Sequence, residues 1–208
     1  MKNQILALIS LLFLFACATG HQQTAEKLRK FVAEKKFTEA IEFLKDSPLA
    51  EDQKSQLLFW NELGLLEHYR GNYHASNEYL AKAKDLIDEL YTTRISGKVS
   101  SILVNDNADL YYGEKYEASL VYFYRALNYY LVAMAEPELM KRRELLSLAR
   151  AEVVGWDSFL TEIKNERMGK ALFKDDLLAK TFGALIHESQ GNHQDDQIAL
   201  QLYKDAQV

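Results

Sequence analysis

The sequence is poor in the residues that form disulfides, tight turns and strands. Its single cysteine, Cys17, excludes an intrachain disulfide. Only two prolines and nine glycines interrupt 208 residues, and alternating runs of Val, Ile and Thr are absent. Apolar residues recur instead at spacings of three and four, among many Ala, Leu, Glu and Lys residues. The pattern therefore predicts a nearly all-helical chain.

The chain also lacks the common motifs of catalysis. It contains no G-x-S-x-G, no P-loop and no Rossmann glycines. Carboxylate pairs such as Glu114 and Glu117 arise by chance on helices rich in Glu. The balance of 25 Lys and Arg against 30 Asp and Glu argues against nucleic acid as a partner. We therefore expect no catalytic residues, cofactor or metal; a cell-wall polymer hydrolase with two opposed carboxylates in a cleft is the weaker alternative.

The chain has one long apolar run, and it lies at the N-terminus. Lys2 precedes an apolar stretch from Ile5 to Phe15 that is broken only by Ser10. This stretch is too short for a permanent membrane span and is typical of a signal peptide.

The run ends in Leu14-Phe15-Ala16-Cys17, which resembles the bacterial lipobox although Phe15 is larger than the usual residue. The resemblance implies that residues 1–16 are a signal peptide and that Cys17 carries the lipid, with 17–23 as a short tether. Ala18 after the cysteine then indicates an exported protein anchored in the outer membrane and facing the periplasm. A buried structural cysteine is the alternative.

Apolar spacing predicts nine helices within one domain at 24–208. Their expected ranges are 24–35, 38–46, 52–70, 73–91, 98–111, 115–134, 138–165, 171–190 and 196–207.

Part of this helical region matches the tetratricopeptide (TPR) pattern, in which helix pairs stack. The stretch from Trp60 to Gly64 matches its opening, W-x₂-L-G, and Gly71, Ser76 and Ala83 follow at the turn, the close crossing and the second helix. A second unit has its turn at Gly113, followed by Tyr116, Ser119, Phe123 and Ala126. A weaker third unit contains Phe37, Ala40 and Leu44.

With the lipobox, these units make the chain similar to a family of bacterial TPR-like lipoproteins, from about Leu63 onward. The most family-like segment is SILVNDNADLYYGEKYEASLVYFYRALNYYLV. The resemblance implies an all-α fold of antiparallel helix pairs in a right-handed, TPR-like solenoid, degenerate and decorated. An irregular helical bundle is the alternative.

Two stretches look alike, HYRGNYHAS at 68–76 and HESQGNHQD at 187–195. Each has two histidines six residues apart around Gly-Asn, but neither supplies the three or four converging ligands of a zinc site. Gly-Asn is typical of a helix C-terminus. The glycine follows the leading histidine by three residues in one stretch and by four in the other. We therefore expect the histidines to occupy different positions around the two turns.

Two segments are candidates for partner binding. Asn105 and Asp106, near Tyr112, do not fit a calcium loop and form either a turn or the polar rim of a groove. The helix at 115–134 is apolar on nearly all sides, which favours a central core position. The alternative places its tyrosines on a concave face. There Tyr124 would contact a peptide, and Arg125 and Asn128 would donate hydrogen bonds to it.

These observations predict a lipid-anchored envelope scaffold that binds a protein or peptide partner through a TPR-like surface. A pilotin-like assembly factor for a pilus or secretion system is the alternative within the same class, on the analogy that some pilotins are TPR lipoproteins. The sequence does not define the oligomeric state.

Overall fold

The computed structural model describes residues 19–96, 115–165 and 176–207, and all regular structure in these ranges is helical. The elements are α2 (Thr19–Ala33), α3 (Phe37–Lys45), α4 (Pro48–Glu51), the 3₁₀ helix η1 (Gln53–Ser55), α5 (Gln56–Tyr69), α6 (Tyr73–Ser96), α7 (Lys115–Ala135), α8 (Leu139–Asn165), α9 (Leu177–Glu188) and α10 (His193–Asp205).

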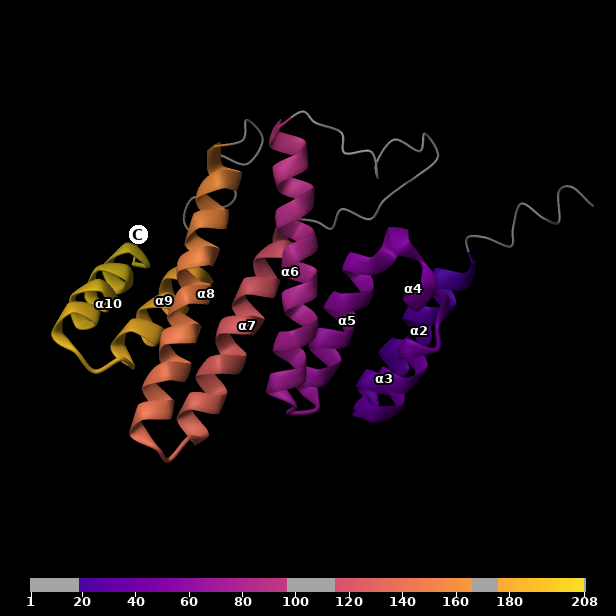
Figure 1. Cartoon of the computed structure of the whole chain (residues 1–208), viewed down its shortest axis with the longest axis horizontal. Coiled ribbons are helices and arrows are strands. Elements are labelled where there is room, and N and C mark those ends of the chain that lie inside the picture. Colours follow the sequence, from indigo (N-terminus) through magenta and orange to yellow (C-terminus); the bar gives the residue numbers. More distant parts are fainter. Residues whose placement is uncertain (1–18, 97–114, 166–175, 208) are drawn as a thin grey trace, which may run out of the picture.

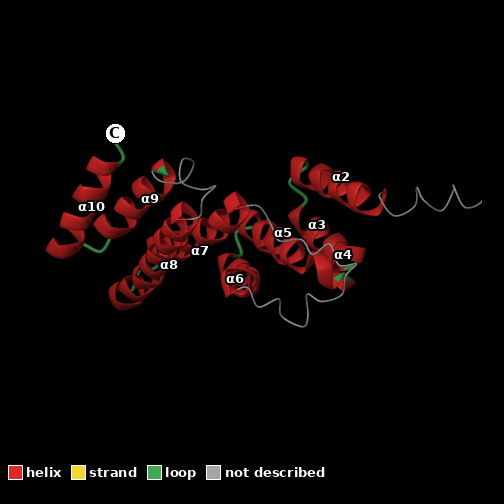
Figure 2. Ribbon diagram, turned by 90° about the horizontal axis from the view of Figure 1, so that it is seen from above, coloured by secondary structure: helices red, strands yellow, loops and turns green. Residues whose placement is uncertain are grey.

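The helices lie in chain order along the long axis of the molecule, from α2 at one end to α10 at the other (Figure 1). They pack as antiparallel pairs, α2 with α3, α5 with α6, α7 with α8 and α9 with α10. Seen from above, α5, α7 and α9 lie along one side of the row, and α6 and α8 lie on the other (Figure 2). We call the surface formed by α5, α7 and α9 the first-helix face.

The predicted all-helical class is confirmed, and most helix bounds differ by only a few residues. Three differences stand out, and two of them have local causes. α2 begins at Thr19, so most of the expected tether at 17–23 is helical. The expected helix at 52–70 is divided because Asp52 accepts a hydrogen bond from the Lys54 N–H and starts η1. α10 begins before residue 196 because the Asn192 side chain caps it.

Some expected features fall outside the described residues. They are the helix at 98–111, the beginning of the helix at 171–190, and the turn at Gly113. Among the helices that the structure describes, none has both the length and the apolar character required to cross a membrane.

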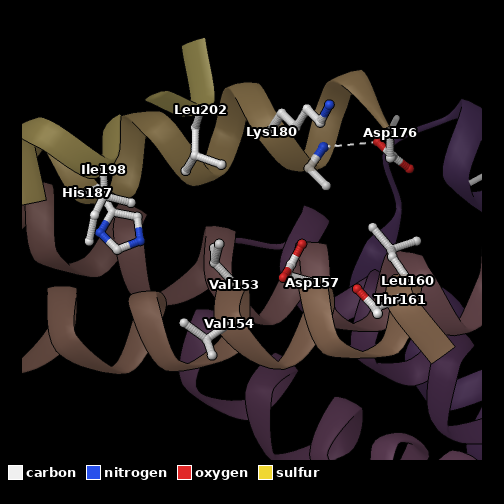
Figure 3. A pocket seen from close by; sticks show the side chains of 11 residues that line it. Val153, Val154, Asp157, Leu160, Thr161, Asp176, Lys180, His187, Ile198 and Leu202 are labelled. Carbon is white, nitrogen blue, oxygen red and sulfur yellow. Dashed lines mark hydrogen bonds between the residues drawn. The ribbon is translucent and has the colours of Figure 1, made fainter. Parts of the chain in front are cut away.

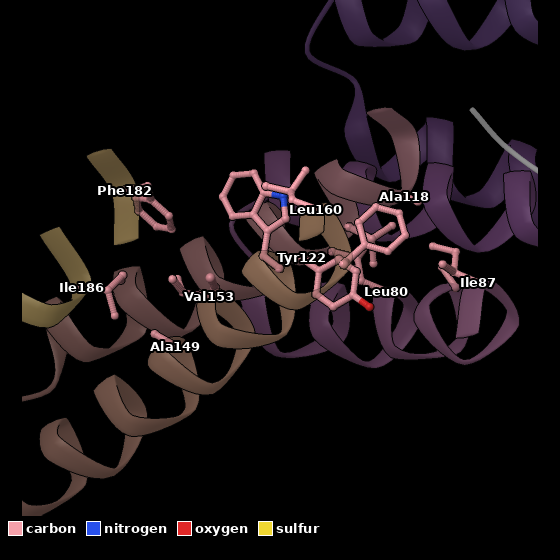
Figure 4. Close-up of a cluster of buried hydrophobic side chains, with 14 of the residues drawn as sticks. Leu80, Ile87, Ala118, Tyr122, Ala149, Val153, Leu160, Phe182 and Ile186 are labelled. Atoms are coloured by element: carbon pink, nitrogen blue, oxygen red, sulfur yellow. The ribbon is translucent and has the colours of Figure 1, made fainter. Parts of the chain in front are cut away.

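The larger hydrophobic core joins α5, α6, α7, α8 and α9, and Figure 4 shows its central part. Trp156 and Ile87 are almost completely buried in it, and the Trp156 indole donates a 2.6 Å hydrogen bond to the Ser119 hydroxyl. A second core joins α2, α3, α4 and α5 around Leu44 and Leu63. Both cores contain residues of α5, so this helix connects the N-terminal helices to the remainder of the row.

A close helix crossing lies between α5 and α6. A Cβ atom at Gly64 would lie 2.5 Å from Leu80 Cγ, and the Ser76 hydroxyl donates a 2.7 Å hydrogen bond to the Gly64 carbonyl. Only a glycine at this position allows the two backbones to approach so closely. The prediction of a small residue at this crossing, at Ser76, is confirmed.

Only the later helix of the second sequence unit lies within the described residues, so its pairing with the segment at 98–111 stays a prediction. The prediction placed Ser119 and Ala126 in the second helix of a pair, whose first helix would be the segment before α7. In the described residues, α7 packs most extensively against α8, so it is the first helix of its own pair. Ser119 does lie at a close helix contact, but its partner is Trp156 of α8.

Both Gly-Asn turns follow the end of a helix, as predicted. Gly71 follows α5 with φ of 84°, and Gly191 follows α9 with φ of 66°. Both values lie in the left-handed region that glycine adopts without strain. After α5, the Asn72 N–H also bonds the Glu67 carbonyl, which closes the end of the helix.

Candidate functional site

Asn128 is the centre of a buried polar network between α5, α6 and α7, which we call the central junction. Its side-chain carbonyl accepts a 2.6 Å hydrogen bond from His68 Nδ1. Its NH₂ group donates to the Ser76 hydroxyl at 2.8 Å and to the Asn77 side-chain carbonyl at 2.9 Å. Asn128 is 0% exposed, and its amide oxygen and both amide hydrogens are used. The central junction therefore fixes how α7 docks on the α5–α6 pair.

Arg125 extends this network to α8. Its guanidinium donates to the Asn77 backbone carbonyl at 2.8 Å and forms a 2.6 Å ion pair with Glu152. Both charged side chains are largely buried, 11% and 12% exposed. Burial alone would lower the pKa of Arg125, but the ion pair with Glu152 outweighs it and raises this pKa. The pair therefore ties three consecutive helices together.

This geometry corrects the hypothesis that Arg125 and Asn128 donate hydrogen bonds to a bound partner. Both side chains point into the helix junction, where buried donors find carbonyl and carboxylate acceptors. Neither group is available on a groove surface. Tyr124 differs, since its side chain is only partly buried and it belongs to the first-helix face.

An aromatic cluster covers the outside of the central junction. The Tyr124 hydroxyl lies 3.3 Å from that of Tyr69, which is 51% exposed, and Phe37 stacks on Tyr69 with ring centroids 5.9 Å apart. Tyr124 also packs edge-on against His68, and Tyr73 lies on another side of that imidazole. Burial, together with the hydrogen bond to Tyr69, raises the pKa of Tyr124 to about 12. We call Phe37, Tyr69, Tyr73 and Tyr124 the tyrosine cluster.

The remaining surface of α7 continues the apolar character of this cluster. One side of the helix is core, where Tyr122 and Ala126 are buried. Another side carries partly or largely exposed apolar side chains, namely Leu120, Phe123, Leu127, Tyr130, Leu131 and Met134. Phe123 and Tyr130 both pack against Phe182 of α9. The helix at 115–134 is therefore both core and surface, so the two interpretations of its sequence each describe one side.

A second polar network, the C-terminal junction, joins α8, α9 and α10 around Asp195. Its carboxylate accepts hydrogen bonds from His187 Nδ1 at 2.6 Å, from the Asn192 amide at 2.6 Å and from Arg150 at 3.3 Å. Burial alone would raise the pKa of Asp195, but these three donors outweigh it and lower this pKa. The carboxylate is therefore ionised at neutral pH and acts only as an acceptor.

The leading histidines of the two similar stretches occupy equivalent places after all. His68 follows Gly64 by four residues, and His187 follows Gly183 by four; both glycines are packed against a neighbouring helix. Each histidine then uses Nδ1 to bond a buried polar residue. The expectation that the histidines differ was wrong for this leading pair, because it was measured from the turn glycine and the α9 turn is one residue longer. It holds for the trailing pair, since His74 is the second residue of α6 and His193 is the first of α10.

The trailing histidines, His74 and His193, lie on the surface. Within the ranges that the structure describes, no three His, Cys, Asp or Glu side chains converge as a metal site requires. Four residues singled out from the sequence lie outside these ranges: Cys17, Asn105, Asp106 and Tyr112.

A cleft of about 380 Å³ opens between α8, α9 and α10 (Figure 3). Its lining is mainly apolar and includes Val153, Leu160, Ile198 and Leu202. His187 lies at one end of it, while Leu160 and Thr161 lie toward the other. The Asp195 carboxylate fixes the orientation of the His187 imidazole, as a carboxylate does for a histidine that acts as a general base. The hydroxyl of Thr161, the one hydroxyl in the lining, lies far along the cleft from His187.

Sequence reasoning missed Tyr69 and this cleft. Tyr69 ends α5 within the HYRGN stretch and could have been found as an aromatic residue in the last turn of a first helix. The cleft had no sequence signal, because it forms where α8 and α10 lie apart and α9 closes the space between them.

Comparison with known proteins assigns no family to this chain, since no family model, curated protein or solved structure matches it.

Proposed function

We propose that this protein is a lipid-anchored, non-catalytic scaffold of the cell envelope that binds a protein or peptide partner. The tyrosine cluster, in which Tyr69 and Tyr124 belong to the first-helix face, is the observation that carries the proposal. Its hydroxyl pair, Tyr69 and Tyr124, gives a large apolar surface with polar tips, a combination enriched at protein interfaces. The apolar side chains of α7 extend this surface along the row.

The arrangement of the helices supports a TPR-like solenoid. Extensive helix contacts join neighbours in the sequence, as in repeat proteins where each unit contacts the next. The crossing of Gly64 and Ser76 has the geometry for which the TPR pattern selects small residues. A row of this kind offers an extended face on which a peptide can contact several helices in succession.

The membrane anchor rests on the lipobox-like residues alone. A lipid on Cys17 would hold the domain at the outer membrane, facing the periplasm, as an assembly or accessory factor of an envelope complex. Metabolic labelling with a radioactive fatty acid tests this part: the wild type should be labelled and Cys17→Ser should not. Equal labelling of both would exclude the anchor.

Site-specific photocrosslinking in intact cells tests the binding face. A photoreactive amino acid at Tyr69 should give one discrete crosslinked product, identifiable by mass spectrometry. The matched control position is Leu148, an apolar residue of α8 that is similarly exposed but lies outside the first-helix face. Tyr124→Ala should weaken the product at Tyr69 without changing the circular dichroism spectrum. Products of equal yield at both positions would show that the face is not a specific binding surface.

A further inference from the structure

The cleft between α8, α9 and α10 is separate from the tyrosine cluster and is not used by the proposed function. α8 and α10 do not pack closely against each other, and α9 closes the space between them. Val153, Val154 and Leu160 line it from α8, and Ile198 and Leu202 line it from α10. At about 380 Å³ it falls in the usual size range of ligand sites, roughly 300 to 1,000 Å³.

One carboxylate in the cleft has no partner in the described part of the chain. Asp157 lies between Val153 and Leu160 on the α8 side (Figure 3). The other two charged groups nearby are engaged: Asp176 accepts a 2.9 Å hydrogen bond from the Ala179 N–H as the cap of α9, and Lys180 donates to the Asp205 carbonyl. Asp157 therefore gives the apolar lining one negative charge that can pair with a ligand.

A second polar group is aimed into the cleft from its other end. His187 is 7% exposed and lines the cleft, and its Nδ1 is bonded to Asp195. A carboxylate oxygen can only accept, so Nδ1 carries the proton of this hydrogen bond, and in that tautomer Nε2 is an acceptor. No described residue hydrogen-bonds Nε2. A buried imidazole held by Asp195, whose carboxylate is itself fixed by Arg150, is a rigid acceptor for a ligand N–H.

We propose that this cleft binds a lysine side chain, together with an adjacent apolar residue, from a peptide segment of a partner protein. The aliphatic stem of a lysine packs against Val153 and Leu160 while its ammonium pairs with Asp157. The neighbouring apolar residue contacts Ile198 and Leu202, and a peptide N–H donates to His187 Nε2. Both polar groups accept hydrogen bonds, which selects a donor-rich, cationic ligand over an acidic one.

Calorimetric titration of the full-length protein in detergent tests the assignment with three capped peptides, acetyl-Leu-Lys-Leu-amide and its norleucine and glutamate analogues. The lysine peptide should bind about five times more tightly than the norleucine peptide, as expected for one partly exposed ion pair, and the glutamate peptide should bind weakest. Asp157→Asn should remove the preference for lysine. Asp196→Asn, which removes an exposed carboxylate of α10, should retain it.

Two further measurements locate the binding site and distinguish a peptide lysine from a small free amine as the ligand. Ala179→Leu, which fills the cleft from α9, should abolish binding of all three peptides, and methyl shifts in NMR spectra should report binding at Leu160 and Leu202. Butylamine should bind at least tenfold more weakly than the lysine peptide. Equal affinity for the three peptides, or an unchanged preference in Asp157→Asn, would overturn the proposal. Butylamine binding as tight as the lysine peptide would overturn the peptide as its ligand.

Discussion

The central junction and the C-terminal junction both join neighbouring helices through a buried polar residue, which is an amide in one and a carboxylate in the other. In each, a histidine near the end of a first helix bonds a buried polar residue through Nδ1. The central junction is built on the neutral amide of Asn128, which is completely buried between three helices. The C-terminal junction is built on the carboxylate of Asp195, whose partner Arg150 is partly exposed. An amide tolerates full burial when all its groups are bonded, whereas a carboxylate needs several donors or a charge nearby.

The two junctions also differ in what lies beside them. The central junction is covered by the tyrosine cluster and is flanked by the large core, and its residues connect α7 to the α5–α6 pair. The C-terminal junction borders an open cleft, and His187 belongs to both. We therefore expect the central junction to determine stability and the C-terminal junction to combine stability with ligand contact.

The largest expected effect is that of Asn128→Leu. The substitution leaves the His68 and Asn77 side chains without their Asn128 partner, while Ser76 keeps its bond to the Gly64 carbonyl, and each unsatisfied group costs about 1–3 kcal/mol. Partial relaxation reduces the total, so we expect a loss of about 3 kcal/mol in the free energy of unfolding, measured by urea denaturation. Gln197→Leu, an exposed amide on α10, is the control and should change it by less than about 0.5 kcal/mol. A loss below about 1 kcal/mol for Asn128→Leu would contradict the central role of this amide.

The next largest effect on unfolding free energy is expected at the two glycines that precede the junction histidines, Gly64 and Gly183. A Cβ at Gly64 would lie 2.5 Å from the buried Leu80 side chain, whereas a Cβ at Gly183 would lie 3.1 Å from Val153 and 3.5 Å from Leu202. Gly64→Ala should therefore destabilise the protein by about 2 kcal/mol through overpacking. Gly183→Ala should be nearly neutral, because the helix propensity of Ala, about 1 kcal/mol better than that of Gly, offsets a milder contact. Equal unfolding free energies for the two variants would show that the crossings are equally tight.

The sequence predicted the helices well because their signal is local. Apolar spacing and the Gly-Asn turns at Gly71 and Gly191 depend only on neighbouring residues. The small-residue crossing was also predictable, since Gly64 and Ser76 belong to one repeat pattern. The undivided helix at 52–70 was wrong because caps such as the Asp52 side chain act over two or three residues.

The direction in which a polar side chain points was not predictable in the same way. Arg125 and Asn128 lie on an almost wholly apolar helix, so their sequence context fits either a groove or a buried junction. The acceptors that decide between them, on Asn77 and Glu152, are 48 and 27 residues away from Arg125 in the chain. Nothing local relates these positions, because the relation depends on how helix pairs dock. The cleft beside His187 was not predictable for the same reason.

A smaller effect concerns acid pH and separates the two junctions. The folded-state pKa of Asp195 is lowered from its ordinary value of 3.8, so its contribution is present above that value and is lost as the pH falls through the folded pKa. We expect Asp195→Asn to lose about 1 kcal/mol of unfolding free energy at pH 7 and to differ less from the wild type at low pH. Asp196→Asn, on the exposed side of the same helix, is the matched control. A difference from the wild type that is constant between pH 7 and 2 would contradict the ionic character of this junction.

The smallest expected effect on stability is that of Tyr69→Phe, which removes one surface hydroxyl contact beside the central junction. We expect a change of at most about 0.5 kcal/mol in unfolding free energy, since the bond is exposed and 3.3 Å long. The effect of this substitution on the pKa of Tyr124 should be clearer than its effect on stability. The pKa of Tyr124 is raised to about 12 by burial and by this hydrogen bond, and burial and the bond to Glu188 also raise the pKa of Tyr203. Ultraviolet titration of the wild type, compared with Tyr203→Phe to remove the second signal, should therefore show Tyr124 ionising late. In Tyr69→Phe this pKa should fall toward the ordinary value of 10.0 but remain above it, because burial persists. If Tyr124 instead titrates near 10 in the wild type, its ring is more exposed than the structure shows, and the tyrosine cluster is a looser surface than a peptide-binding face requires.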